Sequence, residues 1–168
     1  MKINGWLFVD KPIGISSRKV VDLISNSLSI KKVGHAGTLD PMATGLLPVA
    51  IGEATKSIGV IQQLKKRYKF SVKWGEKTST DDKMGSIISI TNIRPNLQNI
   101  KKNVKKFIGQ IKQIPPNFSA IKVNGKRAYM LARNNEDFLL NARTVLIETF
   151  KIKKYLDKDH CSFECVCS

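Results

Sequence analysis

Apolar and polar side chains alternate along several short runs of the chain, and this pattern predicts a protein rich in strands. Residues 68–74 alternate Tyr, Phe, Val and Trp with Lys and Ser, a period of two that is typical of a strand with one buried face. Residues 46–51 form an apolar run between two glycines, which predicts a strand buried on both faces or nearly so. Similar runs predict further strands at residues 6–10, 86–93, 143–152 and 161–168, and a short strand that ends at Asn124-Gly125. We expect the strand at 86–93 to pair with the strand at 68–74 through the polar loop between them.

Apolar residues recur at helical spacing in three other stretches. They fall on one face of residues 17–28, where Ser16 and Ser17 are candidate N-caps. The stretch after Gly52 and residues 98–109 show the same spacing, and Gly109 is a candidate helix stop. Lysines fill the polar side of residues 98–109, which is usually a solvated face and alternatively contacts phosphate. Strands and helices therefore alternate in a mixed α and β protein.

The composition adds a strong positive charge to this picture. The 168 residues are 42% hydrophobic, enough for one domain with a proper core, and 29 Lys and Arg against 13 Asp and Glu give a net charge of +16. Such an excess indicates a polyanionic partner. Nucleic acid fits better than a membrane surface, because no long basic amphipathic helix with an aromatic face is present. We expect a cytoplasmic protein that contacts no membrane, since neither a leader pattern nor eighteen consecutive apolar residues occur.

Three cysteines lie close together near the end of the chain, at positions 161, 165 and 167. An odd number on one stretch is a poor disulfide framework and is consistent with a reducing compartment. With His160 they could form a zinc site, but the paired ligand spacing of structural zinc sites is missing. Their alternation with polar residues favours free thiols on the core face of a strand. We therefore expect no metal.

The stretch from Val33 to Lys56 is the least generic part of the chain. Gly34 and Gly37 predict a tight, exposed loop. Asp40 precedes Pro41, which disfavours the α region and predicts an extended backbone that presents the carboxylate. Asp40 is thus a candidate functional acid, although Asp before proline is more often a turn former. His35 considered alone is an ordinary loop residue, and Tyr68 considered alone is a core tyrosine.

Basic and aromatic side chains are interleaved in residues 113–141, after a Pro115-Pro116 break. Such side chains can follow a phosphate backbone while an aromatic ring stacks on a base. The strand at 68–74 also has a basic face. The candidate RNA-binding residues are Lys69, Lys122, Lys126, Arg127, Tyr129 and Arg133.

Four motifs, in order, carry a resemblance to a known family. The block GHAGTLDPMATGLLPVAIGEATK is similar to the signature of the TruB-type tRNA pseudouridine synthases, bacterial enzymes that modify uridine 55 of tRNA. GWLFVDKPIGISS resembles the family's first motif, and KRYKFSVKWGEKTSTDDKMG resembles its tyrosine-bearing strand and T-x-T-x-D loop. IPPNFSAIKVNGKRAYMLAR resembles its RNA-gripping insertion. The resemblance implies an α+β fold, with a mixed, largely antiparallel sheet flanked by helices.

The resemblance also implies roles for individual residues. Asp40 would attack the target nucleotide, so that the uracil can detach, rotate and rejoin through carbon, without metal or cofactor. Tyr68 would lie against the flipped base, and His35 would fill the space that the base leaves in the T-loop. Lys11 would shape the floor of the pocket, and Gly37 and Leu39 would be further substrate-binding residues. Met84 departs from the acidic residue usual at its position in the T-x-T-x-D loop.

The same resemblance implies which RNA the chain binds and where its catalytic domain is incomplete. Residues 113–141 would be a thumb-like insertion that orders on the T-arm and elbow of tRNA. Residues 1–168 would be an incomplete catalytic domain without a C-terminal PUA domain, because the family continues after FECVCS with a K-G-T-Y-I-R segment. A complementing C-terminal fragment is then a possible partner, and the full-length protein would be a monomer. The alternative hypothesis is an inactive truncated product that only binds tRNA.

Overall fold

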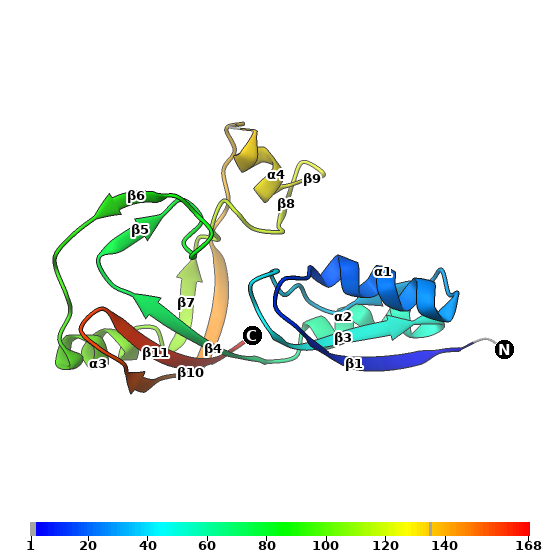
Figure 1. Cartoon of the computed structure of the whole chain (residues 1–168), viewed down its shortest axis with the longest axis horizontal. Coiled ribbons are helices and arrows are strands. Elements are labelled where there is room, and N and C mark those ends of the chain that lie inside the picture. Colours follow the sequence, from blue (N-terminus) through cyan, green and yellow to red (C-terminus); the bar gives the residue numbers. More distant parts are fainter. Residues whose placement is uncertain (1–2, 135) are drawn as a thin grey trace. The chain divides into compact units, whose positions relative to one another are not determined.

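The chain folds into two compact units, residues 1–64 and residues 65–168, each with its own sheet (Figure 1). The computed structural model describes residues 3–134 and 136–168. Antiparallel strand pairs and helices occur in both units. Within the described residues, no helix has the length and apolar character needed to cross a membrane.

The first unit is a three-stranded antiparallel sheet covered by helix α1. The strand order is β1-β3-β2, with β1 at Gly5–Lys11, β3 at Gly45–Ile51 and β2 at Val33–His35. Helix α1 (Ser17–Leu28) begins where the Ser16 side chain accepts a hydrogen bond from the Lys19 backbone N–H, at 3.2 Å. Apolar residues of α1 and β3 form the core of this unit: Val20, Val21, Leu47 and Val49. The strands at 6–10 and 46–51 and the helix at 17–28 are therefore confirmed.

Two parts of the first unit differ from the prediction. The expected loop around Gly34 is a strand, because Val33, Gly34 and His35 pair with β3, and the loop begins only at Ala36. The helical stretch after Gly52 starts as a 3₁₀ helix, η1 (Gly52–Ser57), and continues as the short α2 (Ile58–Gln62).

The second unit contains a four-stranded antiparallel sheet with the order β4-β11-β10-β7. The strands are β4 (Lys66–Lys73), β7 (Gly109–Gln113), β10 (Arg143–Tyr155) and β11 (His160–Cys167). Helix α3 (Leu97–Lys105) packs on one face, where Ile100 joins the buried Cys161 and Phe163. The prediction that Cys161 and Cys165 lie on the core face is confirmed, and burial raises the pKa of both thiols.

Smaller elements complete the second unit. Two hairpins pair β5 (Glu76–Thr78) with β6 (Ile87–Ile90), and β8 (Lys122–Val123) with β9 (Lys126–Arg127), which leads into α4 (Ala128–Arg133). The predicted pairing of β6 with β4 is wrong: β6 pairs with β5, a strand inside the predicted polar loop, and β4 pairs with β11. Helix α3 ends at Lys105, and Gly109 begins β7 with φ +104°.

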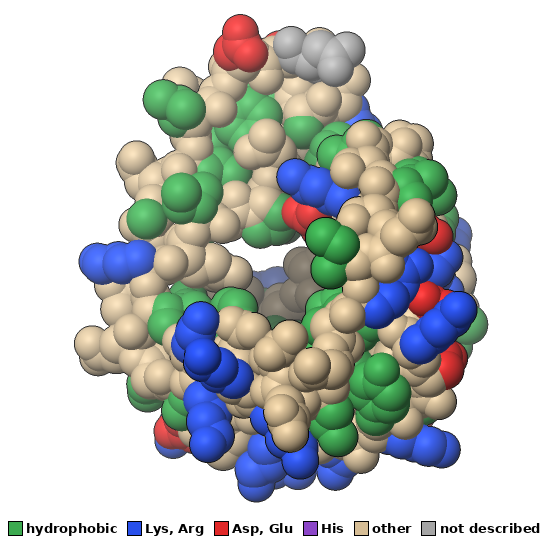
Figure 2. Space-filling view, turned by 90° about the vertical axis from the view of Figure 1, so that its left-hand side faces the viewer, with side chains coloured by type: hydrophobic (Ala, Val, Ile, Leu, Met, Phe, Trp, Pro, Cys, Tyr) green, Lys and Arg blue, Asp and Glu red, His purple; other side chains and the backbone are tan. Residues whose placement is uncertain are grey.

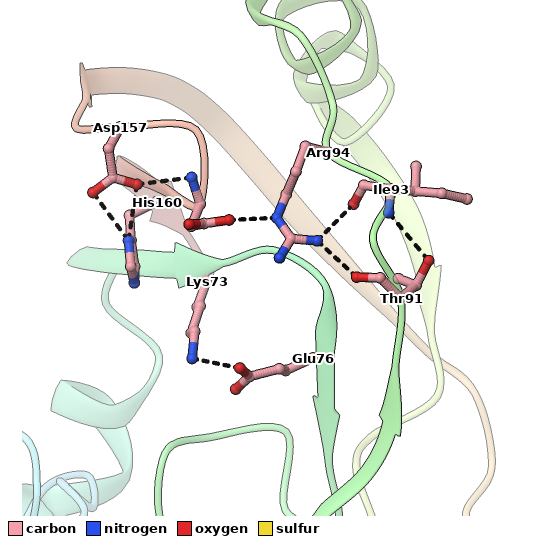
Figure 3. A network of polar contacts seen from close by, with 8 residues as sticks. Lys73, Glu76, Thr91, Ile93, Arg94, Asp157 and His160 are labelled. Carbon is pink, nitrogen blue, oxygen red and sulfur yellow. Dashed lines mark hydrogen bonds and ion pairs between the residues drawn. The ribbon is translucent and has the colours of Figure 1, made fainter.

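Polar contacts fix the turn between β10 and β11 (Figure 3). The Arg94 guanidinium donates hydrogen bonds to the Asp159 carboxylate and, at 2.7 Å, to the Thr91 carbonyl. His160 contacts both carboxylate oxygens of Asp157, at 3.0 and 3.1 Å. The Arg94 contacts connect the segment between β6 and α3 to the turn between β10 and β11, and they stabilise this part of the second unit.

Candidate active site and RNA-binding residues

Asp40 lies in an exposed turn whose backbone is held on both sides. The Ala43 N–H donates to the Asp40 carbonyl at 3.0 Å, which closes a turn with Pro41 at its second position, where proline is favoured. The Gly14 N–H donates to the Pro41 carbonyl at 2.7 Å. Asp40 itself is exposed, and within the described residues its carboxylate makes no hydrogen bond or ion pair. The turn therefore presents an unpaired carboxylate from a fixed backbone.

Leu39, the residue before Asp40, is held by a buried serine. The Ser17 hydroxyl donates to the Leu39 carbonyl and accepts from the Leu39 N–H, both at 2.9 Å. Ser17 is only 2% exposed, and the Leu39 side chain packs against the core formed by α1 and β3. The hydrophobic core thus fixes the position of the acid through its neighbour.

Lys11 ends β1 and is completely buried. Its ammonium donates to the carbonyls of Pro12, at 2.9 Å, and Ile15, at 2.8 Å. These bonds hold the turn between β1 and α1, and Gly14, three residues after Lys11, bonds to Pro41. A buried ammonium needs such partners because desolvation is costly. The contacts fit a shaping role better than a direct chemical one.

His35 and Gly37 lie at the start of the same segment, His35 as the last residue of β2 and Gly37 in the loop that follows. His35 pairs with Val49 at the end of β2, and its Nδ1 contacts the Gly37 carbonyl. Gly37 has φ +109°, a conformation that residues with a Cβ rarely adopt. The Ala36 N–H donates to the Pro48 carbonyl at 2.9 Å. Gly37, Leu39 and Asp40 therefore lie along one short loop of the first unit, and His35 ends the strand that leads into it.

Tyr68 belongs to the second unit, on β4. It pairs with Cys165 of β11 and has 45% of its surface exposed. Burial raises the pKa of its phenol, and the nearby thiols of Cys167 and Cys165 act in the same direction. The alternative interpretation of Tyr68 as a buried core tyrosine is wrong for this structure. A neutral, half-exposed ring on a rigid strand can stack on a base.

The T-x-T-x-D segment lies in the predicted polar loop, and hydrogen bonds among its own residues, which the sequence pattern alone did not reveal, close it into a compact structure. Asp82 accepts hydrogen bonds from the Thr80 hydroxyl, at 2.6 Å, and from the Met84 N–H, at 2.8 Å. The Thr80 bond is the largest cause that lowers the pKa of Asp82. The Thr78 hydroxyl donates to the Asp82 carbonyl at 2.7 Å. Met84 takes part through its backbone, and its side chain is exposed.

The candidate RNA-binding residues occupy two places in the second unit. Lys69 is exposed on β4. The others lie on the hairpin β8–β9 and on α4, where the Arg133 guanidinium lies 5.6 Å from the centre of the Tyr129 ring. Lys126 pairs with Glu136 at 3.3 Å, and the Arg127 guanidinium donates to the Ala120 carbonyl. Lys122, Tyr129 and Arg133 thus remain available beside these internal contacts.

Further lysines are exposed on α3, and none of them was predicted as a specific site. Figure 2 shows the side on which α3, β5 and β6 lie in Figure 1, and Lys and Arg side chains gather along its lower part.

Nowhere in the described parts of the chain do three or more His, Cys, Asp or Glu side chains cluster as metal ligands would.

Ser17 was missed as a contributor to the site, because the sequence only marked it as a candidate N-cap. Its partner Leu39 lies 22 residues away. The only sequence signal for this role is the pair Ser16-Ser17. A helix needs one N-cap serine, so the second serine is available for another contact.

Comparison with known proteins gives a consistent match. Residues 25–168 match the TruB family pseudouridylate synthase (N terminal domain). The chain belongs to this family. It is 50% identical over 151 residues to tRNA pseudouridine synthase B of Ehrlichia ruminantium (strain Gardel), covering 90% of this chain and 51% of that protein. It is 46% identical over 165 residues to the protein of the same name from Roseobacter denitrificans, covering 98% of this chain and 54% of the other. The chain spans about half the length of these curated TruB relatives.

Solved structures share the TruB chain's fold. A crystal structure of a Cbf5-Nop10-Gar1 complex matches with a TM-score of 0.69 and 24% identity, over 99% of this chain and 40% of the other. The structure of an H/ACA RNP bound to a substrate RNA containing 2'-deoxyuridine matches with a TM-score of 0.65 and 22% identity, over 97% of this chain and 37% of the other. The expected α+β fold of mixed, largely antiparallel sheets and helices is therefore confirmed.

Proposed function

We propose that this TruB-family chain takes part in the isomerisation of uridine to pseudouridine in the T-loop of tRNA, with Asp40 as the nucleophile. The observation that carries the proposal is the unpaired carboxylate of Asp40, presented from a turn that Ser17, Gly14 and Ala43 hold in place. A nucleophile on a fixed backbone is what covalent catalysis requires.

The reaction conserves all atoms of the nucleotide. Asp40 forms a bond with the nucleotide while the bond between sugar and ring nitrogen breaks. The uracil then rotates and bonds to the sugar through carbon, and the bond to Asp40 breaks, which restores the free carboxylate. The proton lost from that carbon is balanced by one gained on the freed nitrogen. No oxidant, metal or cofactor is needed for such a balance.

The other residues serve the base and the RNA. The target base must leave the stacked T-loop before it can react. Tyr68 receives the flipped base against its half-exposed ring, and His35 fills the space in the T-loop. Lys11 and Gly37 keep the loop in shape. Residues 113–141 grip the T-arm and elbow through Lys122, Lys126, Arg127, Tyr129 and Arg133.

Replacing the nucleophile tests the catalytic part of the proposal. Asp40→Asn keeps the size of the side chain and removes its charge, so pseudouridine formation in T-loop RNA should become undetectable while tRNA binding persists. The matched control is Asp22→Asn on α1, where the carboxylate contacts Arg18 at 2.9 Å and lies on an exposed helix face. The control should retain the activity. Pseudouridine formation by the Asp40→Asn protein would contradict the assignment.

The second candidate function is tRNA binding without isomerisation. It is favoured by one observation: within the described residues no arginine contacts Asp40, although a paired arginine would keep a carboxylate ionised and oriented. If the unmutated chain binds tRNA and forms no product, this function holds for the chain alone. Adding a fragment that carries the remaining half of a TruB relative should then restore product formation under the first proposal.

A further inference from the structure

The sheet of the second unit has two faces of opposite character. The face under α3 is aromatic, with Phe70, Phe150 and Phe163 in contact with one another. Side chains alternate across a strand, so the residues between these aromatics point to the opposite face. That opposite face carries Arg67 and Lys69 from β4 and Lys151 and Lys154 from β10. These four residues are called the outer basic face.

The strand register brings these distant cations together. Lys69 pairs with Glu164 of β11, and Glu164 pairs with Lys151 of β10. The two lysines are therefore two strand spacings apart, about 10 Å between backbones. In the next row on this face, Ser71 pairs with Ser162, and Ser162 with Lys154, which follows a register shift after Ile152. The sequence separates Lys69 from Lys151 widely, and only the antiparallel topology makes them neighbours.

The cations of the outer basic face are not neutralised by the protein. Among the described residues, Arg67, Lys69, Lys151 and Lys154 make no ion pair. The one acid between them, Glu164, lies 4.0 Å from the Lys153 ammonium and has a side chain that is only 15% exposed. Glu164 on the middle strand directly faces both Lys69 and Lys151, so one carboxylate is shared by two lysines and the four cations keep a net positive excess that pairing within the sheet does not balance. A polyanionic ligand does.

We propose that the outer basic face binds the phosphate backbone of the tRNA substrate, as an RNA contact separate from the 113–141 insertion and from the face that carries Tyr68. No aromatic ring of β4, β10 or β11 lies among the four cations, so the contact reads phosphate charge and not base identity. It strengthens binding and orients the RNA without selecting a sequence. This inference rests on the proposed function for its choice of tRNA.

Charge removal at the row that holds Lys69 and Lys151 tests the inference. We expect Lys69→Gln combined with Lys151→Gln to weaken tRNA binding roughly tenfold at low salt, measured by fluorescence anisotropy with labelled tRNA. The slope of log K against log salt should fall in magnitude by about 1.4–1.8, because two phosphate contacts are lost. The matched control is Lys101→Gln with Lys105→Gln on α3, which removes the same charge from two exposed lysines. The control should change the affinity much less.

A third variant separates charge from structure. Lys69→Arg with Lys151→Arg keeps both charges and should bind tRNA as the unmutated chain does. Equal losses in the outer-face variant and the α3 control would show that only net charge matters and would overturn the proposal, as would an unchanged affinity. The test is independent of catalysis: Asp40→Asn protein should show the same dependence on the outer basic face, whether or not the chain forms pseudouridine.

Discussion

At the scale of single residues, the acid is positioned by its neighbours and not by contacts of its own. Within the described residues the Asp40 side chain makes no hydrogen bond or ion pair, whereas Leu39 before it is hydrogen-bonded to Ser17, the first residue of α1, and Pro41 after it to Gly14. The carboxylate thus stays free for chemistry while its backbone is fixed. Ser17 is the residue on which this arrangement depends most, because its hydroxyl serves Leu39 as both donor and acceptor.

Ser17→Ala should therefore damage both stability and activity. It leaves the N–H and C=O of Leu39 without their partner, and we expect the free energy of unfolding to fall by about 1–3 kcal/mol. In an active form of the enzyme, kcat should fall while tRNA affinity changes little, because the acid loses its anchor. Urea unfolding and single-turnover pseudouridine formation measure the two effects.

Ser16→Ala provides the control for this variant. Ser16 caps α1 and does not contact Leu39, so its loss should cost about 1 kcal/mol of stability and leave kcat intact. If both serine variants reduced kcat alike, the anchoring of Asp40 through Leu39 would be refuted.

The sequence marks Asp40 as a candidate acid but does not reveal the contacts that hold its backbone, for a physical reason. Proline restricts the residue before it, so the backbone of Asp40 is readable from Asp40-Pro41 alone. The contact between Ser17 and Leu39 spans 22 residues and appears only when α1 packs on β3. Tyr68 likewise has the period of a core residue, but it lies on β4, an edge strand of the sheet, and the residue is 45% exposed.

At the scale of elements, strands with a visible local pattern were predicted, and strands that depend on a distant pairing partner were missed. Strand β11 buries one face, and β4 directs its apolar side chains to the same side of the sheet, so the alternation of both strands is visible in the sequence. Strand β5 (Glu76–Thr78) is short and polar, and it exists because β6 pairs with it. Whether such a short polar segment forms a strand depends on its pairing partner and not on its local sequence pattern.

Gly85→Ala should disrupt the T-x-T-x-D loop between β5 and β6. A Cβ at this position would come within 2.4 Å of the Thr80 hydroxyl and 2.7 Å of the Thr80 backbone nitrogen. Thr80 would have to move, and the hydrogen bond that its hydroxyl donates to the Asp82 carboxylate would break. We expect a loss of roughly 1–3 kcal/mol in unfolding free energy, together with faster hydrogen exchange at the N–H of Met84.

Gly59→Ala is the matched substitution without a clash. Gly59 lies in α2, and nothing lies within 4 Å of the position of its Cβ. Alanine should stabilise the protein there by up to about 1 kcal/mol, since glycine costs more backbone entropy in a helix. Stabilisation by both alanines would show that the loop has room for a side chain and would contradict the tight packing around Gly85.

At the scale of the whole molecule, positive charge is concentrated in one unit. Residues 65–168 contain 22 Lys and Arg against 9 Asp and Glu, a net charge of +13, whereas residues 1–64 contain 7 against 4, a net charge of +3. The acid lies in the weakly charged unit, and the predicted RNA-binding residues lie in the strongly charged one. Under the proposed function, the chemistry of Asp40 and most of the electrostatic attraction for RNA would thus belong to different units.

Lysine acetylation, read by mass spectrometry with and without tRNA, should reveal this division. We expect tRNA to protect Lys69, Lys122 and Lys151, while the exposed Lys19 and Lys31 of the first unit continue to react. Lys11 is an internal standard, because it is completely buried and should resist acetylation even without RNA. High salt should abolish the protection as phosphate contacts are lost. Protection of Lys19 and Lys31 equal to that of the second unit would show that RNA binding follows overall charge, and the division of labour between the two units would then be wrong.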